Sequence, residues 1–203
     1  MSVVIAIKEK DRIYLAADSM CSCGNTKVTL SNPNNYKIWK TKGLDNSFMC
    51  HTGNCRDLGV IRFKNFIPEI RSLNGDIDID FVQGQMIYDM FDFLDERGFL
   101  EKNNEGPRMG SCLLFAYKDK VWELTNCSYV IEIDDYVALG SGSDAAMGSL
   151  AATIGEPIED RLIKAVLAAS KIDLSVDFPI VITDTKSCEF KLFDQDDFNI
   201  LNI

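Results

Sequence analysis

The chain opens on the stretch Ser2-Val3-Val4-Ile5-Ala6-Ile7, and Arg12-Ile13-Tyr14-Leu15-Ala16-Ala17 follows after four charged residues. Both segments are short and apolar, and Lys8-Glu9-Lys10-Asp11 between them is typical of a turn. The pattern predicts an antiparallel hairpin of strands Val3–Ile7 and Arg12–Ala17, with its first strand buried in the core. A serine stands directly in front of the first strand, and Asp18 directly follows the second.

Runs of strands and pairs of helices alternate along the rest of the chain. The turn residues and the apolar periodicity predict further strands at Lys27–Leu30, Tyr36–Thr41, Phe48–Thr52, Ser111–Tyr117, Lys120–Thr125, Tyr129–Ile133, Val137–Leu139, Ile180–Thr183 and Glu189–Phe193. Helices are predicted from Asn54 through Leu58, Ile61, Phe66 and Ile70, from Phe81 to near Gly98, over Ala145–Ile154 and over Ile158–Ile172. We expect Asn54 to cap the first helix, Asp78 or Asp80 to cap the second, and Pro68 to kink or shorten the first.

This order of elements predicts an α+β fold. Antiparallel strands alternating with helix pairs are typical of layered architectures in which each sheet buries one face against the other sheet. We expect a four-layer αββα sandwich of two antiparallel sheets with the helix pairs outside, formed by residues 1–203 as a single domain. A chain of 203 residues is long enough for one sizeable core.

Composition excludes several classes of function. The formal net charge of −10 argues against a nucleic-acid binder, which would present a basic face. No apolar run approaches the ~20 residues that span a bilayer, and the first residues lack a signal-peptide pattern, so we expect a cytoplasmic protein without membrane contact. The seven cysteines are scattered and odd in number, which favours reduced thiols. Cys21-x-Cys23 is too closely spaced for a usual zinc site, and we expect no metal and no cofactor.

A serine at a free N-terminus carries its own base. An unperturbed α-amine titrates near about 7.7–8.0, close to the optimum for a general base at neutral pH. After removal of Met1, which the small side chain of Ser2 favours, one residue would supply both nucleophile and base. His51 is the sole histidine and lies at the end of a predicted strand, so we expect it to be structural.

Four sequence blocks occur in an order that resembles the proteasome β-subunit family. This family of N-terminal-nucleophile hydrolases includes the peptidase of the bacterial two-ring ATP-dependent protease. The blocks are Ser2-Val3-Val4-Ile5-Ala6-Ile7, Ile13-Tyr14-Leu15-Ala16-Ala17-Asp18, Asn35-Tyr36-Lys37-Ile38 and Ala138-Leu139-Gly140-Ser141-Gly142-Ser143. Each block alone is weak, but their order and spacing hold over nearly the whole chain.

The resemblance implies a set of catalytic residues. Ser2 falls on the nucleophile, where most active members have threonine; a serine lacks the methyl that restricts the hydroxyl, so we expect a slower or more promiscuous enzyme. Asp18 falls on the acidic partner of a lysine, which is Lys37 by order and Lys40 or Lys42 if the turn at 31–35 shifts the match. The alternative for Asp18 and Lys37 is a pair of solvated surface charges.

The remaining assignments come from the two loops that follow. Gly53 matches the glycine whose N–H forms the oxyanion hole, although a glycine needed only for the strand-to-helix turn is the alternative. Ser141 and Gly142 match the Gly-Ser-Gly loop that holds the α-amine, where the alternative for Ser141 is a helix N-cap. Asp173 matches a supporting aspartate, with Ser175 as its candidate partner.

The resemblance implies a peptidase within a self-compartmentalised ring. We expect peptide hydrolysis by Ser2, polypeptide substrates, a homo-oligomeric ring and an ATP-dependent unfoldase as a possible partner, since the chain has no ATP-binding motif of its own. Two alternatives stay open: a catalytically inactive ring subunit that retains Met1, and an N-terminal-nucleophile amidase acting on small amides.

Overall fold

Two five-stranded antiparallel sheets form the centre of the computed structural model, which describes residues 2–23, 25–64, 66 and 77–198. The first sheet has the strand order β12 (Tyr136–Leu139), β1 (Val4–Glu9), β2 (Arg12–Ala17), β13 (Ile180–Asp184) and β14 (Lys191–Phe193). The second has the order β11 (Val130–Glu132), β10 (Lys120–Leu124), β9 (Ser111–Tyr117), β6 (Ser47–Gly53) and β5 (Ile38–Lys40).

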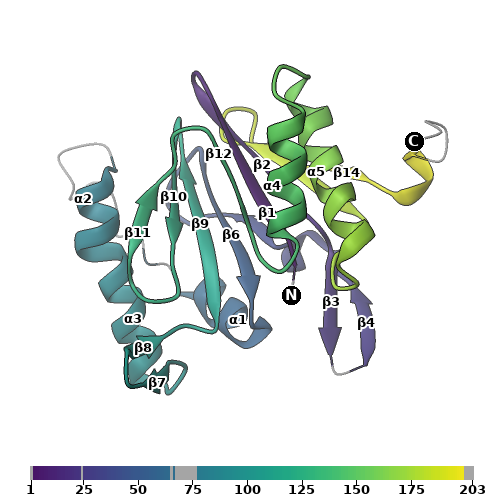
Figure 1. The fold of residues 1–203 in the computed structure, drawn as a ribbon. Coiled ribbons are helices and arrows are strands. Elements are labelled where there is room, and N and C mark those ends of the chain that lie inside the picture. Colours follow the sequence, from purple (N-terminus) through teal and green to yellow (C-terminus); the bar gives the residue numbers. More distant parts are fainter. Residues whose placement is uncertain (1, 24, 65, 67–76, 199–203) are drawn as a thin grey trace.

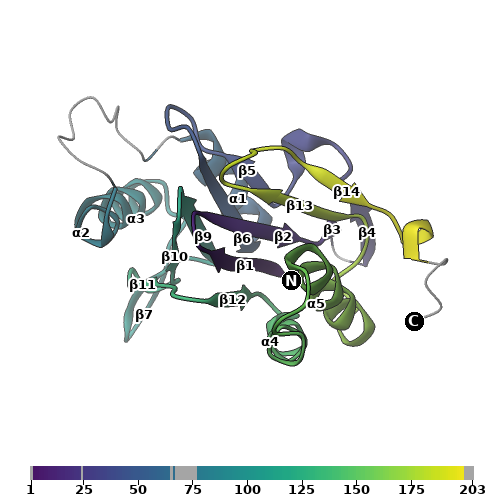
Figure 2. The ribbon, with the colours of Figure 1, turned by 90° about the horizontal axis from the view of Figure 1, so that it is seen from above.

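Helices cover the outer faces of the two sheets. The second sheet packs against α1 (Cys55–Phe63) and a continuous helical run made of α2 (Ile79–Phe81), the π-helical segment η3 (Val82–Met86) and α3 (Ile87–Glu96). The first sheet packs against α4 (Ser143–Ala152) and α5 (Ile158–Ile172). Figure 1 shows these layers side by side, and Figure 2 shows the same order from above. The predicted αββα sandwich is confirmed.

The alternation of side chains along β1 explains why its sequence is almost wholly apolar. Val4 and Ala6 pack between the sheets against residues such as Phe48. Ile5 and Ile7 point to the opposite face and pack with the core under α4 and α5. Because successive strand residues face opposite sides, a strand covered on both faces needs a continuous apolar run.

The predicted elements agree with the structure in order and type, but several differ in detail. A hairpin of β3 (Met20–Cys23) and β4 (Thr26–Thr29) replaces the predicted single strand at Lys27–Leu30, and a second hairpin, β7 (Glu101–Asn103) with β8 (Gly106–Arg108), was not predicted. These strands are short and mostly exposed, so they lack the apolar alternation that identifies a strand. Helix α4 begins earlier than predicted, at Ser143. Short 3-10 helices lie at η1 (Pro33–Asn35) and η4 (Gln195–Phe198).

The first predicted helix is too long. Asn54 caps α1 as expected, but Lys64 already has extended backbone, so α1 ends at Phe63 and the buried Phe66 lies beyond it. Pro68 and Ile70 lie outside the described residues. In the second helical run, Asp78 rather than Asp80 is the cap, because its side chain accepts a hydrogen bond from the backbone N–H of Phe81.

Candidate active site

Ser2 lies immediately before β1, against the loop that joins β12 to α4. Val4 of β1 pairs with Leu139 of β12. Because the two strands are antiparallel, Val3 and Ser2 lie beside Gly140 and Ser141. The backbone nitrogen of Ser2 donates to Ser141 Oγ at 3.1 Å, and the N–H of Gly142 donates to the Ser2 carbonyl at 3.3 Å. Met1, whose removal the proposed chemistry requires, lies outside the described residues.

Gly140 must be a glycine because Ser2 lies so close. Its φ of +106° is unfavourable for other residues, and a Cβ there would collide with the Ser2 carbonyl and the Thr52 hydroxyl. The Thr52 hydroxyl also donates to Ser2 Oγ at 3.3 Å. The glycine of this loop therefore permits the close contact that holds Ser2.

Asp18 and Lys37 form a buried ion pair beside this end of β1. Lys37 Nζ donates to Asp18 Oδ1 at 2.7 Å, and only 5% of Lys37 and none of Asp18 is exposed. The same carboxylate oxygen accepts the N–H of Val3 at 2.9 Å. The other oxygen accepts the N–H of Met20 at 3.0 Å and that of Asp177 at 3.4 Å. This geometry excludes the alternative of solvated surface charges, and it identifies Lys37, not Lys40 or Lys42, as the partner of Asp18.

The environment of Asp18 contains opposing influences on its pKa. Complete burial raises the pKa of this carboxyl, whereas the charge and hydrogen bond of Lys37 and the N–H groups of Val3 and Met20 lower it. Burial is the largest of these influences, so the pKa of Asp18 is raised, and the hydrogen bonds and the countercharge offset only part of the cost of desolvation. A buried charge held in this way fixes the position of the lysine ammonium.

A cavity of about 210 Å³ opens beside Ser2. Its lining comes from the start of β1, from β3, from the residue before β5 and from the junction of β6 with α1. The lining residues are Ser2, Met20, Cys21, Ser22, Leu30, Lys37, His51, Gly53, Asn54, Cys55 and Leu58. Ser2, Lys37 and Gly53, which are far apart in the sequence, thus share one cavity.

Gly53 ends β6 at the wall of this cavity. Its φ is +121°, and a Cβ would lie 2.5 Å from the Gly110 carbonyl oxygen. Both features require a glycine here because of the backbone conformation and packing alone. This agrees with the alternative that Gly53 is needed only for the strand-to-helix turn, and it does not test the proposed oxyanion role. The two roles are compatible, because the same conformation brings Gly53 to the cavity.

His51 belongs to a buried chain of polar side chains that sequence reasoning missed. The Ser111 hydroxyl donates to Asp57 Oδ2 at 3.0 Å and lies 2.8 Å from His51 Nε2. Since the hydroxyl proton is used on Asp57, His51 must donate from Nε2. Burial, assisted by the charge of Lys37, lowers the pKa of His51 from 6.5 to about 3. An imidazole with so low a pKa, whose Nε2 donates to Ser111, is a poor general base at neutral pH, so another group must serve as the base for Ser2.

Asp173 lies at the end of α5, near Ser141. Its carboxylate accepts the N–H of Ser175 at 2.8 Å. Partial burial acts to raise the pKa of Asp173, but hydrogen bonds from Ser141 and Ser175 outweigh it and lower that pKa. The N-cap of α4 is Gly142, without a side-chain cap, so the alternative of Ser141 as N-cap is wrong. The structure thus links the Ser2 nitrogen, Ser141 and Asp173 in space.

Among the described residues, no group of three or more histidine, cysteine or acidic side chains could hold a metal ion. In the same part of the chain, no helix is long and apolar enough to cross a bilayer.

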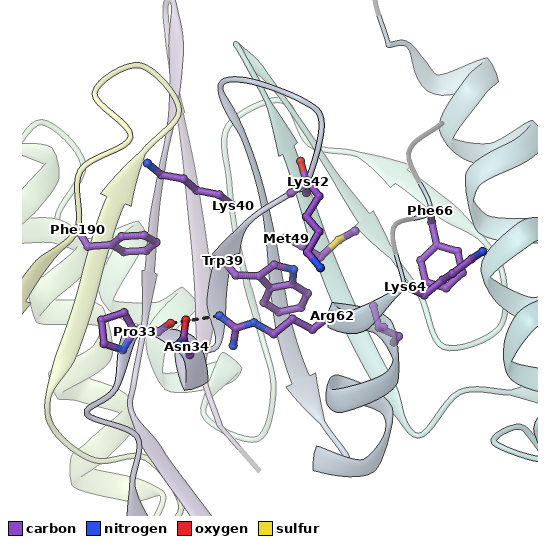
Figure 3. A pocket seen from close by; sticks show the side chains of 12 residues that line it. Pro33, Asn34, Trp39, Lys40, Lys42, Met49, Arg62, Lys64, Phe66 and Phe190 are labelled. Carbon is purple, nitrogen blue, oxygen red and sulfur yellow. Dashed lines mark hydrogen bonds between the residues drawn. The ribbon is translucent and has the colours of Figure 1, made fainter. Parts of the chain in front are cut away.

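A larger cavity, of about 290 Å³, lies on the other side of β5 and α1. Figure 3 shows its aromatic, methionine and basic side chains, with the Arg62 guanidinium beside the Trp39 ring. Arg62 donates to the carbonyls of Tyr36 and Pro33 at 3.1 and 3.2 Å. Its lining residues are Pro33, Asn34, Trp39, Lys40, Thr41, Lys42, Met49, Ile61, Arg62, Lys64, Phe66 and Phe190. This lining includes the Thr41 hydroxyl, but the cavity beside Ser2 combines a hydroxyl with a buried ion pair and is therefore the better candidate for covalent catalysis.

Known proteins resemble this chain in structure rather than in sequence. No known family profile matches the sequence, and no curated protein matches it. Solved structures do match. BPH of Thiobacillus denitrificans has a TM-score of 0.71 at 20% identity, over 90% of this chain and 96% of that chain. The same protein in complex with Epoxomicin gives a TM-score of 0.70 at 20% identity, over 90% and 97%.

A eukaryotic HslV from Trypanosoma brucei matches with a TM-score of 0.66 at 17% identity, over 90% of this chain and 98% of that chain. The matches therefore extend over nearly the full length of each protein. The fold that the four sequence blocks predict is confirmed: the chain has the fold of the proteasome-type N-terminal-nucleophile hydrolases.

Proposed function

We propose that this protein is a proteasome-type peptidase subunit that hydrolyses peptide bonds with the hydroxyl of Ser2 after removal of Met1. The observation that carries the proposal is the placement of Ser2 in a cavity with the buried Lys37–Asp18 pair, its own nitrogen bonded to Ser141. The likeness to BPH and HslV, both proteasome-type hydrolases, supports the same class.

In the proposed acylation step, Ser2 Oγ attacks the carbonyl carbon of the scissile peptide bond. The α-amine of Ser2 takes the hydroxyl proton, directly or through a water molecule. Lys37 stabilises the developing alkoxide by its charge, and Asp18 keeps the ammonium in place. The N–H of Gly53 stabilises the oxyanion of the tetrahedral intermediate.

The intermediate then expels the amine half of the substrate, which receives the proton from the Ser2 ammonium. A water molecule attacks the resulting ester and regenerates the free hydroxyl. Ser141 positions the α-amine, with the support of the Gly142 N–H and Asp173. His51 is not the proposed proton acceptor, because its pKa of about 3 makes it too weak a base at neutral pH.

The proposed assembly is a homo-oligomeric ring that hides the sites from folded proteins. Ile172 and Leu174, 78% and 88% exposed, flank Asp173 and are large apolar side chains that a neighbouring subunit would cover. Unfolded polypeptide is the proposed substrate, supplied by an ATP-dependent unfoldase. Size-exclusion chromatography with light scattering tests the ring, and a monomer at micromolar concentration would contradict it.

Two measurements test the catalytic proposal. Intact-mass analysis is expected to show a chain that begins at Ser2; a retained Met1 would favour the inactive ring subunit instead. Wild-type protein, Ser2→Ala and Ser2→Thr are then assayed with fluorogenic peptides and small amides. We expect peptide cleavage to disappear in Ser2→Ala and to persist in Ser2→Thr, which keeps a hydroxyl. Unchanged cleavage in Ser2→Ala would exclude Ser2 as the nucleophile, and cleavage of small amides alone would favour the amidase.

A further inference from the structure

Two cysteines meet across the cavity beside Ser2. Cys21 lies on β3 and Cys55 is the first residue of α1, 34 positions later, and both line the cavity. Their Sγ atoms are 3.1 Å apart. A disulfide bond is about 2.05 Å long, so the two sulfurs need to approach by only about 1 Å to bond.

We propose that Cys21 and Cys55 form a redox-sensitive dithiol that closes the cavity beside Ser2 when it is oxidised to a disulfide. The bond would join the β3–β4 hairpin to the start of α1, and both contribute residues to the wall of the cavity. Cys21 is partly buried and Cys55 is exposed, so an oxidant reaches Cys55 first and Cys21 lies ready to resolve the product.

Both walls are otherwise anchored independently of the sulfur contact. The Asn54 N–H donates to the Gly110 carbonyl at 3.0 Å, which ties the start of α1 to the segment before β9. The hairpin is attached to the segment after α5, because Lys27 pairs with Asp177 at 2.5 Å. With the thiols reduced, the walls can separate to admit a chain; with the disulfide formed, they cannot.

The chemistry needs only a peroxide as oxidant. The Cys55 thiol reacts with hydrogen peroxide to give a sulfenic acid and one water. The Cys21 sulfur then attacks the sulfenic sulfur, the S–S bond forms, and a second water leaves. Two electrons pass from the thiol pair to the peroxide, and a dithiol reductant reverses the reaction.

Burial, together with the hydrogen bond to Cys55, raises the pKa of Cys21 to about 11. Little of the Cys21 thiol is therefore ionised at neutral pH. Cys21 suits the second step, attack on the adjacent sulfenic sulfur, better than the first reaction with peroxide. Cys50 is fully buried in the core between the sheets, where burial also raises the pKa of its thiol. These environments predict that oxidation begins at Cys55.

The test maps the cross-link and measures activity in the same sample. Purified protein is treated with a small excess of hydrogen peroxide, free thiols are alkylated, and non-reduced peptides are analysed by mass spectrometry. We expect a linked peptide pair containing Cys21 and Cys55, which dithiothreitol separates. No cross-link, or a link from Cys21 to Cys23 or to another cysteine, would overturn the proposal. Mapping of the cross-link does not depend on catalysis, so it tests the disulfide independently of the proposed function.

The activity readout rests on the proposed function. We expect peptide cleavage by oxidised wild type to fall by about tenfold or more and to recover on reduction, because linked walls cannot separate to let the substrate reach its reactive position beside Ser2. Each variant is compared with its own reduced form. Cys55→Ser is expected to keep its activity under peroxide, whereas Cys127→Ser, which removes an exposed thiol outside the cavity, should respond like wild type. Equal inhibition of Cys55→Ser and wild type would show that the cross-link is not the cause and would overturn the closure.

Discussion

Helix α1 and the segment 37–42, which includes β5, line two cavities with different chemistry. In the cavity beside Ser2, the cation Lys37 is 5% exposed and shares a fully buried carboxylate with three backbone N–H groups. In the cavity beside Trp39, Arg62 lies over the aromatic ring, 5.2 Å from its centroid, and donates to backbone carbonyls, while Lys40 is exposed. The second cavity is the larger one.

The difference shows why cavity size does not locate the chemistry. A charge that is removed from water must be paired and hydrogen-bonded, and its geometry is then fixed. Beside Trp39, Arg62 is half-buried and burial lowers the pKa of its guanidinium, whereas the exposed Lys40 keeps its hydration and contributes little to stability. The comparison predicts that substitutions of equal size have large effects beside Ser2 and small effects beside Trp39.

Replacement of Lys37 is expected to reveal the largest difference between the two cavities in stability and activity. Lys37→Met leaves Asp18 buried without a countercharge, which should lower the free energy of unfolding by about 3–5 kcal/mol. Peptide cleavage should fall by about 10²–10³-fold, the scale associated with a lost electrostatic contact in a catalytic site. Urea unfolding and initial rates measure both. Lys40→Met removes an exposed cation nearby and should change stability by no more than about 0.5 kcal/mol.

A double variant separates the effect of the Asp18–Lys37 pair on stability from its effect on catalysis. In Asp18→Asn/Lys37→Met both charges are gone, so much of the lost stability should return while cleavage stays low. If Lys37→Met and Lys40→Met lost similar amounts of stability and activity, the contrast between the cavities would be wrong.

Substitution of Gly53 tests whether the backbone at the wall of the Ser2 cavity is held as rigidly as the buried Lys37–Asp18 pair. Gly53→Ala places a Cβ at φ +121° and 2.5 Å from the Gly110 carbonyl oxygen. The unfavourable backbone and the overpacking together should lower the free energy of unfolding by about 2–4 kcal/mol. Gly59→Ala is the matched control: it lies within α1 with no atom within 4 Å of the new Cβ, and it should stabilise the helix by up to about 1 kcal/mol. A stable Gly53→Ala would contradict the packing at this turn.

Because His51 is buried, it makes the free energy of unfolding depend on pH in a way that an exposed histidine would not. His51 has a pKa of about 3 in the folded protein and 6.5 when unfolded, so the unfolded chain binds the extra proton between these values. Its contribution to stability is present above pH 6.5 and is lost as the pH falls toward 3. Between pH 6.5 and 5, wild type should lose about 2 kcal/mol more than His51→Gln. Urea unfolding at several pH values measures this difference, and parallel pH profiles would contradict it.

The sequence identifies those parts of the site that depend on local pattern. Ser2, Asp18 and Lys37 were predicted together because the sequence blocks that resemble the proteasome β-subunit family place each of them at the border of an evident apolar strand. The Ser111–His51–Asp57 chain was not, since it joins residues 54 and 60 positions apart whose hydrogen bonds leave no periodic signal. The Cys21–Cys55 contact was missed for the same reason. The β3–β4 and β7–β8 hairpins were missed or misplaced because exposed strands need no apolar alternation.

The smallest effect is expected at Arg62, where charge and geometry can be separated. Arg62→Lys keeps the positive charge but loses the planar donors that reach the Tyr36 and Pro33 carbonyls. If these hydrogen bonds matter more than the charge, Arg62→Lys and Arg62→Met should each lose about 1 kcal/mol of unfolding free energy, and neither should change peptide cleavage. A large loss of cleavage in either variant would mean that the Trp39 cavity is coupled to Ser2 through α1, and that the two cavities are one functional unit.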